Sequence, residues 1–203
     1  MEFDDGFAPP APSLAGRHVA LVLLAGVLVV AGSWKSPFTT YDDTAHVSAN
    51  PLLAPTVPLM SYFSPRSDEA YIPITLLSWR LDRWLWAGWM PQRLGSWAPG
   101  VRTVNLLLHV LAALLLLDFL RGLGLSPGEA LFLSLAFALH PTACESVCWV
   151  TERKNVLAAF FSFLTVFLWI LLVPGASSST DGAGRSRGGS GSGVPEGARA
   201  RVA

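Results

Sequence analysis

The feature that most constrains this chain is a group of ionisable residues between two runs without charge. Neither the run Leu131–Leu139 nor the run Val156–Val173 contains a charged residue. Five ionisable side chains lie between them: His140, Glu145, Glu152, Arg153 and Lys154. Charges beside hydrocarbon are costly, so such a group usually faces a polar cavity, a headgroup or a substrate. The runs predict membrane helices, and the group predicts a functional site at one membrane face. The simpler alternative is that Arg153 and Lys154 only mark a helix end by reaching toward headgroups.

The composition places the chain among membrane proteins. Hydrophobic residues make up 52% and charged residues only 14%, against about 25% charged in soluble domains. The net charge is zero and no basic arm is present, so a nucleic-acid partner is not expected. The chain has 8 tryptophans, and those between Trp79 and Trp97 are typical of a membrane–water interface. The expected partner is therefore a lipid bilayer.

Four apolar segments predict an all-α integral membrane protein with about four membrane helices. The membrane domain covers residues 17–173, with helices at about 18–34, 103–120, 129–149 and 155–173. The third is expected to be short, kinked or re-entrant because Pro141 interrupts it and a spanning helix needs about 20 residues. Residues 1–16 and the Gly/Ser/Arg-rich residues 174–203 are predicted to be disordered.

Residues 35–102 form a loop between the first two segments. Within it, Pro73–Trp89 carries apolar residues at helical spacing, namely Ile74, Leu77, Leu81, Trp84 and Leu85. This pattern predicts an amphipathic helix lying on the bilayer surface. With the N-terminus inside the cell, this first extracytoplasmic loop and the charged group lie on the same outer side.

The loop opens with two adjacent acids, Asp42 and Asp43. One could act as a general base, or the pair could bind a divalent cation. A loop-start turn or a helix cap would also use aspartate. We expect both acids to be exposed, and a common cavity would bring them close to Arg153 and Lys154.

Two other pairs favour structural roles. Asn105 and His109, one turn apart in an apolar segment, are expected to hydrogen-bond to a neighbouring helix. Cys144 and Cys148 share a helix face in poor disulfide geometry and lack histidines at zinc-finger spacing, so they are expected to be free, packed thiols.

From Phe38 to Leu172, the chain resembles one family of membrane proteins. The resemblance is carried by Tyr41-Asp42-Asp43, Asn50-Pro51, Tyr71-Ile72-Pro73, Val104-Asn105, His109, His140-Pro141, Glu145-Ser146-Val147, Trp149-Val150 and Glu152-Arg153-Lys154. It is similar to the N-terminal portion of the transmembrane and tetratricopeptide-repeat (TMTC-type) O-mannosyltransferases and their bacterial repeat-bearing relatives, of the GT-C glycosyltransferase fold.

The resemblance implies inverting transfer of a sugar, such as mannose, from a polyprenyl-phosphate donor to a protein Ser or Thr. It implies that Asp42 or Asp43 is the catalytic base. It further implies that donor and phosphate binding falls to His140, Glu145, Glu152, Arg153 and Lys154. The location would be the endoplasmic reticulum in a eukaryote or the inner membrane in a bacterium. Such a chain is expected to be a truncated member of the family. The alternative hypothesis is a non-catalytic membrane fragment or scaffold that keeps the first helices of the fold.

Overall fold

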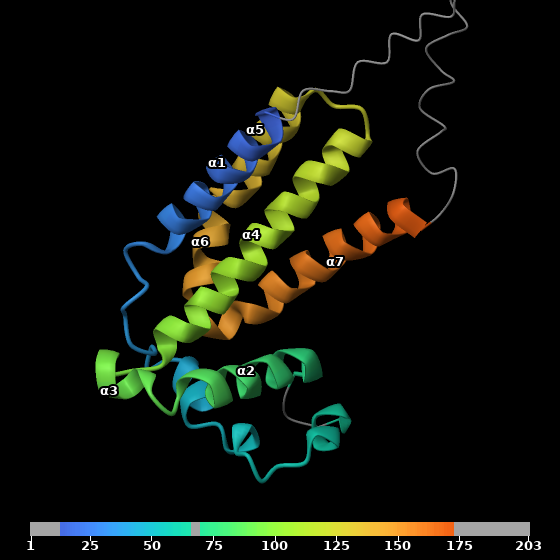
Figure 1. The fold of residues 1–203 in the computed structure, drawn as a ribbon. Helices are drawn as coiled ribbons and strands as arrows, with labels where there is room; N and C mark the ends of the chain where they lie inside the picture. The colour runs from blue at the N-terminus through green and yellow to red at the C-terminus, as the bar shows by residue number, and fades with distance from the viewer. Residues whose placement is uncertain (1–12, 66–69, 173–203) are drawn as a thin grey trace, which may run out of the picture.

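The computed structural model describes residues 13–65 and 70–172 of the chain. Within these ranges every regular element is helical, so the all-α prediction is confirmed. The elements form a helix bundle with a smaller layer at one end (Figure 1). The predicted disorder of residues 1–16 is wrong for residues 13–16, which form the first turn of the apolar helix Ser13–Val30. The rest of that stretch and residues 174–203 lie outside the described residues.

The helix bundle consists of α1 (Ser13–Val30), α4 (Ala98–Gly122), α5 (Pro127–Ala138), α6 (Pro141–Cys148) and α7 (Arg153–Leu172). Helix α4 is central and contacts each of the others. Helices α1, α5 and α6 pack along one side of it, whereas α7 diverges from it toward its own C-terminal end (Figure 1). Of the charged group, His140 caps the start of α6 and Glu145 lies within it, whereas Glu152, Arg153 and Lys154 lie where the chain enters α7.

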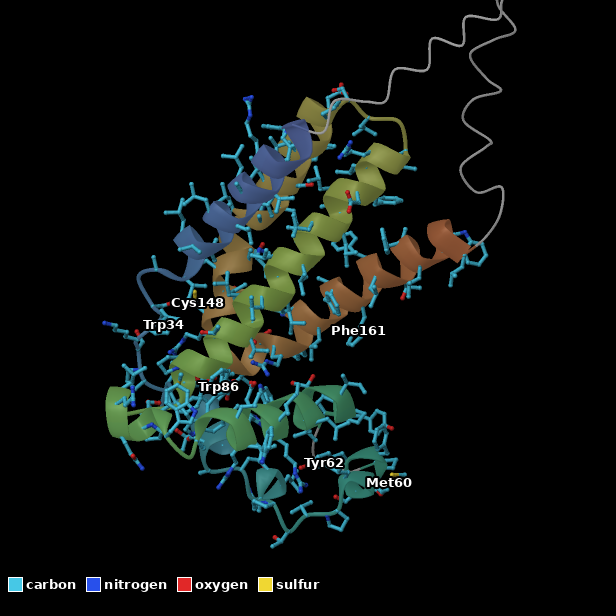
Figure 2. All side chains as sticks on the ribbon, in the orientation of Figure 1. Trp34, Met60, Tyr62, Trp86, Cys148 and Phe161 are labelled. Carbon is cyan, nitrogen blue, oxygen red and sulfur yellow. The ribbon has the colours of Figure 1, made fainter. Side chains whose placement is uncertain are left out.

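The loop layer lies across the end of the bundle. It contains the short helical turns η1 (Thr44–Ser48), η2 (Pro51–Leu53) and η3 (Leu59–Phe63), followed by α2 (Pro73–Trp86) and α3 (Met90–Leu94). A further turn, η4 (Val150–Glu152), joins α6 to α7. The hydrophobic core of the layer includes Trp79 and Tyr62, which are both buried. Figure 2 labels Tyr62 within this layer. This core includes Val101 and Val150 from the bundle side, so the two parts share one interior.

The predicted break in the third segment is found at Leu139–His140. Helices α5 and α6 are bent by 53° there. Proline disfavours helical φ and ψ angles in the residue before it. At the first position of a helix, proline itself is well tolerated because the backbone N–H that it lacks would have no partner there. His140 is accordingly non-helical, and its Nδ1 accepts the Thr142 amide at 3.3 Å as a cap of α6. The histidine that the sequence singled out is thus placed by its proline neighbour.

The membrane character rests on particular helices. Among the described residues, α4 is the single helix long and apolar enough to cross a bilayer, and the bent pair α5–α6 would count as a second span. Helix α1 is apolar but shorter. Outward-facing side chains of the bundle are apolar, as at Leu28, Phe132 and Trp169, which are each more than half exposed. Such a surface suits lipid, and the four-span arrangement stays a prediction.

Helix α2 has a second face that the sequence pattern did not reveal. Thr75, Leu76, Trp79 and Asp82 are buried against the bundle and the turns of the loop layer. The apolar stripe that predicted an interfacial helix lies opposite this face, and its Trp84 is 77% exposed. The stripe is therefore free to meet lipid or another surface, whereas the face carrying Asp82 belongs to the protein interior.

Candidate functional site

The first loop and the charged group meet through Asp43. The Thr151 hydroxyl donates to Oδ1 of Asp43 at 2.7 Å, and the Thr151 amide donates to the same oxygen at 3.2 Å. The Thr39 amide donates to Oδ2 at 2.9 Å. Asp43 is 0% exposed, so the expectation that both acids are exposed is wrong for this residue. Its carboxylate joins two segments 108 residues apart in the chain.

A buried guanidinium from α4 holds the same two segments. Arg102 donates to the carbonyl of Cys148 at 2.8 Å and to the carbonyl of Pro37 at 3.0 Å. It also donates to the carbonyl of Ser36. The start of the loop and the end of α6 are thereby fixed to the first turns of α4. A guanidinium carries five donors in a fixed fork, which suits this task.

Arg153 lies at the centre of the junction and is fully buried. It forms an ion pair with Asp82 of α2 and donates to Oδ1 of Asn105 at 2.7 Å and to the carbonyl of Val101 at 2.8 Å. A buried charge is tolerated only when it is paired and its donors are satisfied. Arg153 meets this condition with partners from α2 and α4. Although Arg153 begins α7, its side chain is buried, so the alternative in which it reaches toward headgroups is wrong for this residue.

Burial raises the pKa of the Asp82 carboxyl to about 6, because the loss of solvation outweighs the opposing attraction of Arg153. The Asp82–Arg153 pair is therefore a buried ion pair inside the junction. Asp82 lies on α2, which the sequence pattern predicted to be a helix on the membrane surface.

The remaining charged residues of the predicted site are accessible. Lys154 pairs with Glu152 at 2.6 Å, with side-chain exposures of 43% and 19%. Asn155 donates to the other oxygen of Glu152 at 2.6 Å. Glu145 is exposed on α6. Arg153 and Lys154 are neighbours in sequence, but one is an interior residue and the other faces outward.

Asp42 and Asp43 are likewise adjacent in sequence, but Asp42 is more accessible than the buried Asp43. It is half-buried, and within the described residues its carboxylate has no hydrogen bond or ion pair. Its backbone carbonyl accepts the His46 amide, which begins the turn η1. Since Asp43 is anchored by three hydrogen bonds, the backbone on which Asp42 stands is held in place. Asp42 is therefore the free acid of the pair.

A pocket of about 390 Å³ lies between α4, α5, α6 and α7. Its polar lining residues come from three of these helices and the cap of α6: His109, His140, Thr142, Ser146 and Asn155. The other lining residues are apolar or small, including Phe137 and Val156. Of the predicted donor-binding residues, His140 lines this pocket, whereas Glu145, Glu152, Arg153 and Lys154 do not. Asn155 connects the pocket to the partly exposed Glu152–Lys154 pair.

The structural roles expected for Asn105 and His109 are confirmed. Asn105 donates to the Val147 carbonyl of α6 at 3.1 Å, and the His109 ring lies 3.1 Å from the Ala138 carbonyl of α5. Asn105 also accepts from Arg153, so it links the helix contact to the ion pair.

Sequence reasoning missed Asp82, Arg102 and Thr151 as members of the junction. The available signal was the spacing of Trp79, Asp82 and Trp86, which places a lone acid on a tryptophan-lined helix face.

Comparisons with known proteins support one family. No family model and no solved structure matches the chain. It is 29% identical over 174 residues to the human protein O-mannosyl-transferase TMTC4, and 30% identical over 171 residues to the mouse protein of that name. Each match covers 73% of this chain but 22% of the relative. The chain thus spans about a fifth of the length of the curated relatives it matches, and these matches support the resemblance to the TMTC proteins.

Proposed function

We propose that this chain is the membrane-embedded, N-terminal part of a GT-C-type glycosyltransferase that moves mannose from a polyprenyl-phosphate carrier to a protein Ser or Thr. The similarity to two protein O-mannosyl-transferases supports the reaction class. The observation that carries the proposal is the junction itself. It anchors Asp43, leaves the Asp42 carboxylate free, and holds the loop against the turn that precedes Lys154.

Asp42 is the base in this proposal. Its carboxylate takes the proton of the acceptor hydroxyl as the hydroxyl oxygen attacks the anomeric carbon of the sugar. The bond from that carbon to the phosphate oxygen breaks, and the configuration is inverted. Asp43 is unsuited to this step because its oxygens already accept hydrogen bonds from Thr39 and Thr151. It acts as a positioning residue that fixes the backbone beside Asp42.

The departing phosphate needs positive charge or hydrogen-bond donors nearby. Lys154 is the accessible cation of the predicted set, and His140 lies in the pocket between the helices. In this proposal, these two residues contact the phosphate, and the largely apolar pocket takes the first part of the polyprenyl chain. Arg153 has a supporting role, because its donors are engaged by Asp82, Asn105 and Val101.

A second candidate is a non-catalytic membrane scaffold. The observation that favours it is that Asp43, Arg102 and Arg153 are all buried in the junction, where each stabilises packing. A scaffold would need the network and would not need a free acid.

The test is a transfer assay in membranes from cells that express this chain within the complete glycosyltransferase that the proposal assigns it to. The membranes receive a radiolabelled mannosyl-phosphoryl-polyprenol and a peptide rich in Ser and Thr. Asp42→Asn should abolish transfer and leave the thermal midpoint unchanged, whereas Asp43→Asn should lower the midpoint because it disturbs a buried carboxylate. Asp118→Asn, at an exposed acid of α4, is the matched control.

The outcomes separate the candidates. Transfer that persists in Asp42→Asn removes Asp42 from the base role. A complete wild-type protein that inserts and folds but transfers no sugar supports the scaffold.

A further inference from the structure

Two histidines line the pocket between α4, α5, α6 and α7, and each has one ring nitrogen hydrogen-bonded to the backbone. His109 comes from the middle of α4 and is 5% exposed. His140 is exposed and caps the start of α6. In a neutral imidazole, the hydrogen bond made by one ring nitrogen decides which nitrogen carries the proton. The two backbone partners therefore determine what each ring offers to the pocket.

In His109, the proton lies on Nε2. This nitrogen is 3.1 Å from the carbonyl oxygen of Ala138, and a carbonyl can only accept. The ring is neutral, because a buried imidazolium needs a counter-ion and no acidic side chain of the described residues lines the pocket. Nδ1 therefore holds a lone pair. Within the described residues Nδ1 has no hydrogen-bond partner, so a buried acceptor is left for a ligand.

In His140, the second nitrogen has the opposite role. Its Nδ1 accepts the amide hydrogen of Thr142 at 3.3 Å and lies 2.5 Å from the Thr142 hydroxyl oxygen. Because an amide nitrogen only donates, Nδ1 carries no proton and Nε2 of the neutral ring carries it. In the part of the chain that the structure describes, this Nε2 has no partner. The pocket thus offers one acceptor, Nδ1 of His109, and one donor, Nε2 of His140.

The remaining walls of the pocket suit hydrocarbon. Phe137, Val156 and three alanines form most of them. The helices that build the pocket also turn apolar side chains outward, as at Phe132 and Trp169, and α7 diverges from α4 beyond the pocket (Figure 1). An apolar pocket with a few convergent polar groups is typical of a small-molecule site. A ligand for this one needs an apolar body and an uncharged group that both donates and accepts, and a hydroxyl does both.

We propose that the pocket binds a lipid alcohol, whose hydroxyl hydrogen donates to Nδ1 of His109 and whose hydroxyl oxygen accepts from Nε2 of His140. The hydrocarbon chain lies against Phe137 and Val156. A phosphodiester fits this pair of nitrogens less well. Its oxygens can accept from His140, but it has no hydrogen to donate, so the buried Nδ1 of His109 stays unsatisfied.

The site goes beyond the proposed sugar transfer and would exist equally in a scaffold. The proposed function places the first part of the polyprenyl chain in the same pocket. A lipid alcohol would therefore compete with the carrier lipid for the apolar walls. This competition rests on the proposed function, whereas binding of the alcohol does not.

The binding test uses the chain in detergent micelles, with its 4 histidines labelled with ¹⁵N, and farnesol as the lipid alcohol. Nuclear magnetic resonance should show a proton on Nε2 and none on Nδ1 in both His109 and His140. Farnesol should shift the Nδ1 signal of His109 in a saturable manner. Farnesyl methyl ether, which has no hydroxyl hydrogen, should bind at least about fivefold more weakly, since one net hydrogen bond is lost.

The role of His109 is tested by His109→Gln. The glutamine amide nitrogen can still donate to the Ala138 carbonyl, but the acceptor at Nδ1 is gone, so farnesol should bind at least about fivefold more weakly. His46→Gln, at an exposed histidine of η1, is the matched control and should bind as the wild type does.

Three results would overturn the site. These are equal affinity for farnesol in the wild type and His109→Gln, equal affinity of the wild type for farnesol and its methyl ether, and a proton on Nδ1 of His109. The comparison with the ether uses the wild type, so it decides the question even where His109→Gln does not fold. None of these results bears on the transfer assay, which depends on Asp42.

Discussion

Two adjacent cations should respond very differently to the same substitution. Arg153→Met removes a fully buried guanidinium that pairs with Asp82 and donates to Asn105 and Val101. Breaking a buried pair by removing one partner costs about 3–5 kcal/mol. Lys154→Met removes a cation that is 43% exposed and has one partner. Exposed pairs contribute about 0–1 kcal/mol. The expected difference is therefore at least about 2 kcal/mol for neighbours of equal charge.

The assay is denaturant unfolding in detergent micelles, followed by the fluorescence of the chain's 8 tryptophans. Trp79 and Trp86 report directly because they lie on α2 beside Asp82. The double variant Arg153→Met with Asp82→Leu should cost less than the sum of the two single variants, because neither charge is left unpaired. Equal midpoints for Arg153→Met and Lys154→Met, or strict additivity in the double variant, would refute the buried ion pair.

Three further measurements probe the packing and the charges. Gly26→Ala should destabilise the chain by about 1–3 kcal/mol, because a Cβ there would clash with Cγ2 of Val110. Gly16→Ala on the same helix meets nothing within 4 Å and should be neutral or stabilising. Equal thermal midpoints for the two variants would contradict the α1–α4 contact. The raised pKa of Asp82, about 6 against 3.8, contributes stability that is present below pH 3.8 and lost as pH rises through about 6. This loss is at most about 3 kcal/mol; unfolding of Asp82→Asn should lack that slope, and a slope unchanged in the variant would assign it to other groups. Thr151→Val leaves a buried carboxylate without its hydroxyl donor and should cost about 1–3 kcal/mol in the same unfolding assay; a change under about 0.5 kcal/mol, the usual range for surface substitutions, would mean that this bond is not formed.

The helices of the bundle follow from local sequence and could be predicted without the fold. Long uncharged runs form helices because backbone groups in an apolar setting must bond within their own segment. Pro141 ends one helix and starts the next because it restricts His140 and lacks an amide hydrogen. The polar residues Asn105 and His109, placed one turn apart in an apolar segment, could be expected to bond to neighbouring helices, and they do.

The roles within the charged group could not be read in the same way. Asp42 and Asp43 are identical neighbours in the sequence, and Arg153 and Lys154 are neighbours of equal charge. In each pair, the residue that is buried is the one whose side chain meets a hydrogen-bonding or charged partner from a distant segment of the chain. Thr151 decides this for Asp43, and Asp82 decides it for Arg153. The helical spacing of apolar residues shows which side chains share one face of a helix. It does not show what the opposite face contacts, so it could not reveal that α2 also packs toward Arg153.

The cysteine pair shows the same division between sequence and tertiary structure. The spacing of Cys144 and Cys148 determined that they share a helix face and that they do not pair as a disulfide. Both thiols donate to the backbone carbonyl of Val29, a group that every residue carries and that no sequence pattern distinguishes. Only the packing of the end of α1 against α6 brings this carbonyl to the two sulfurs, because long-range contacts are selected by the whole fold and not by local propensity.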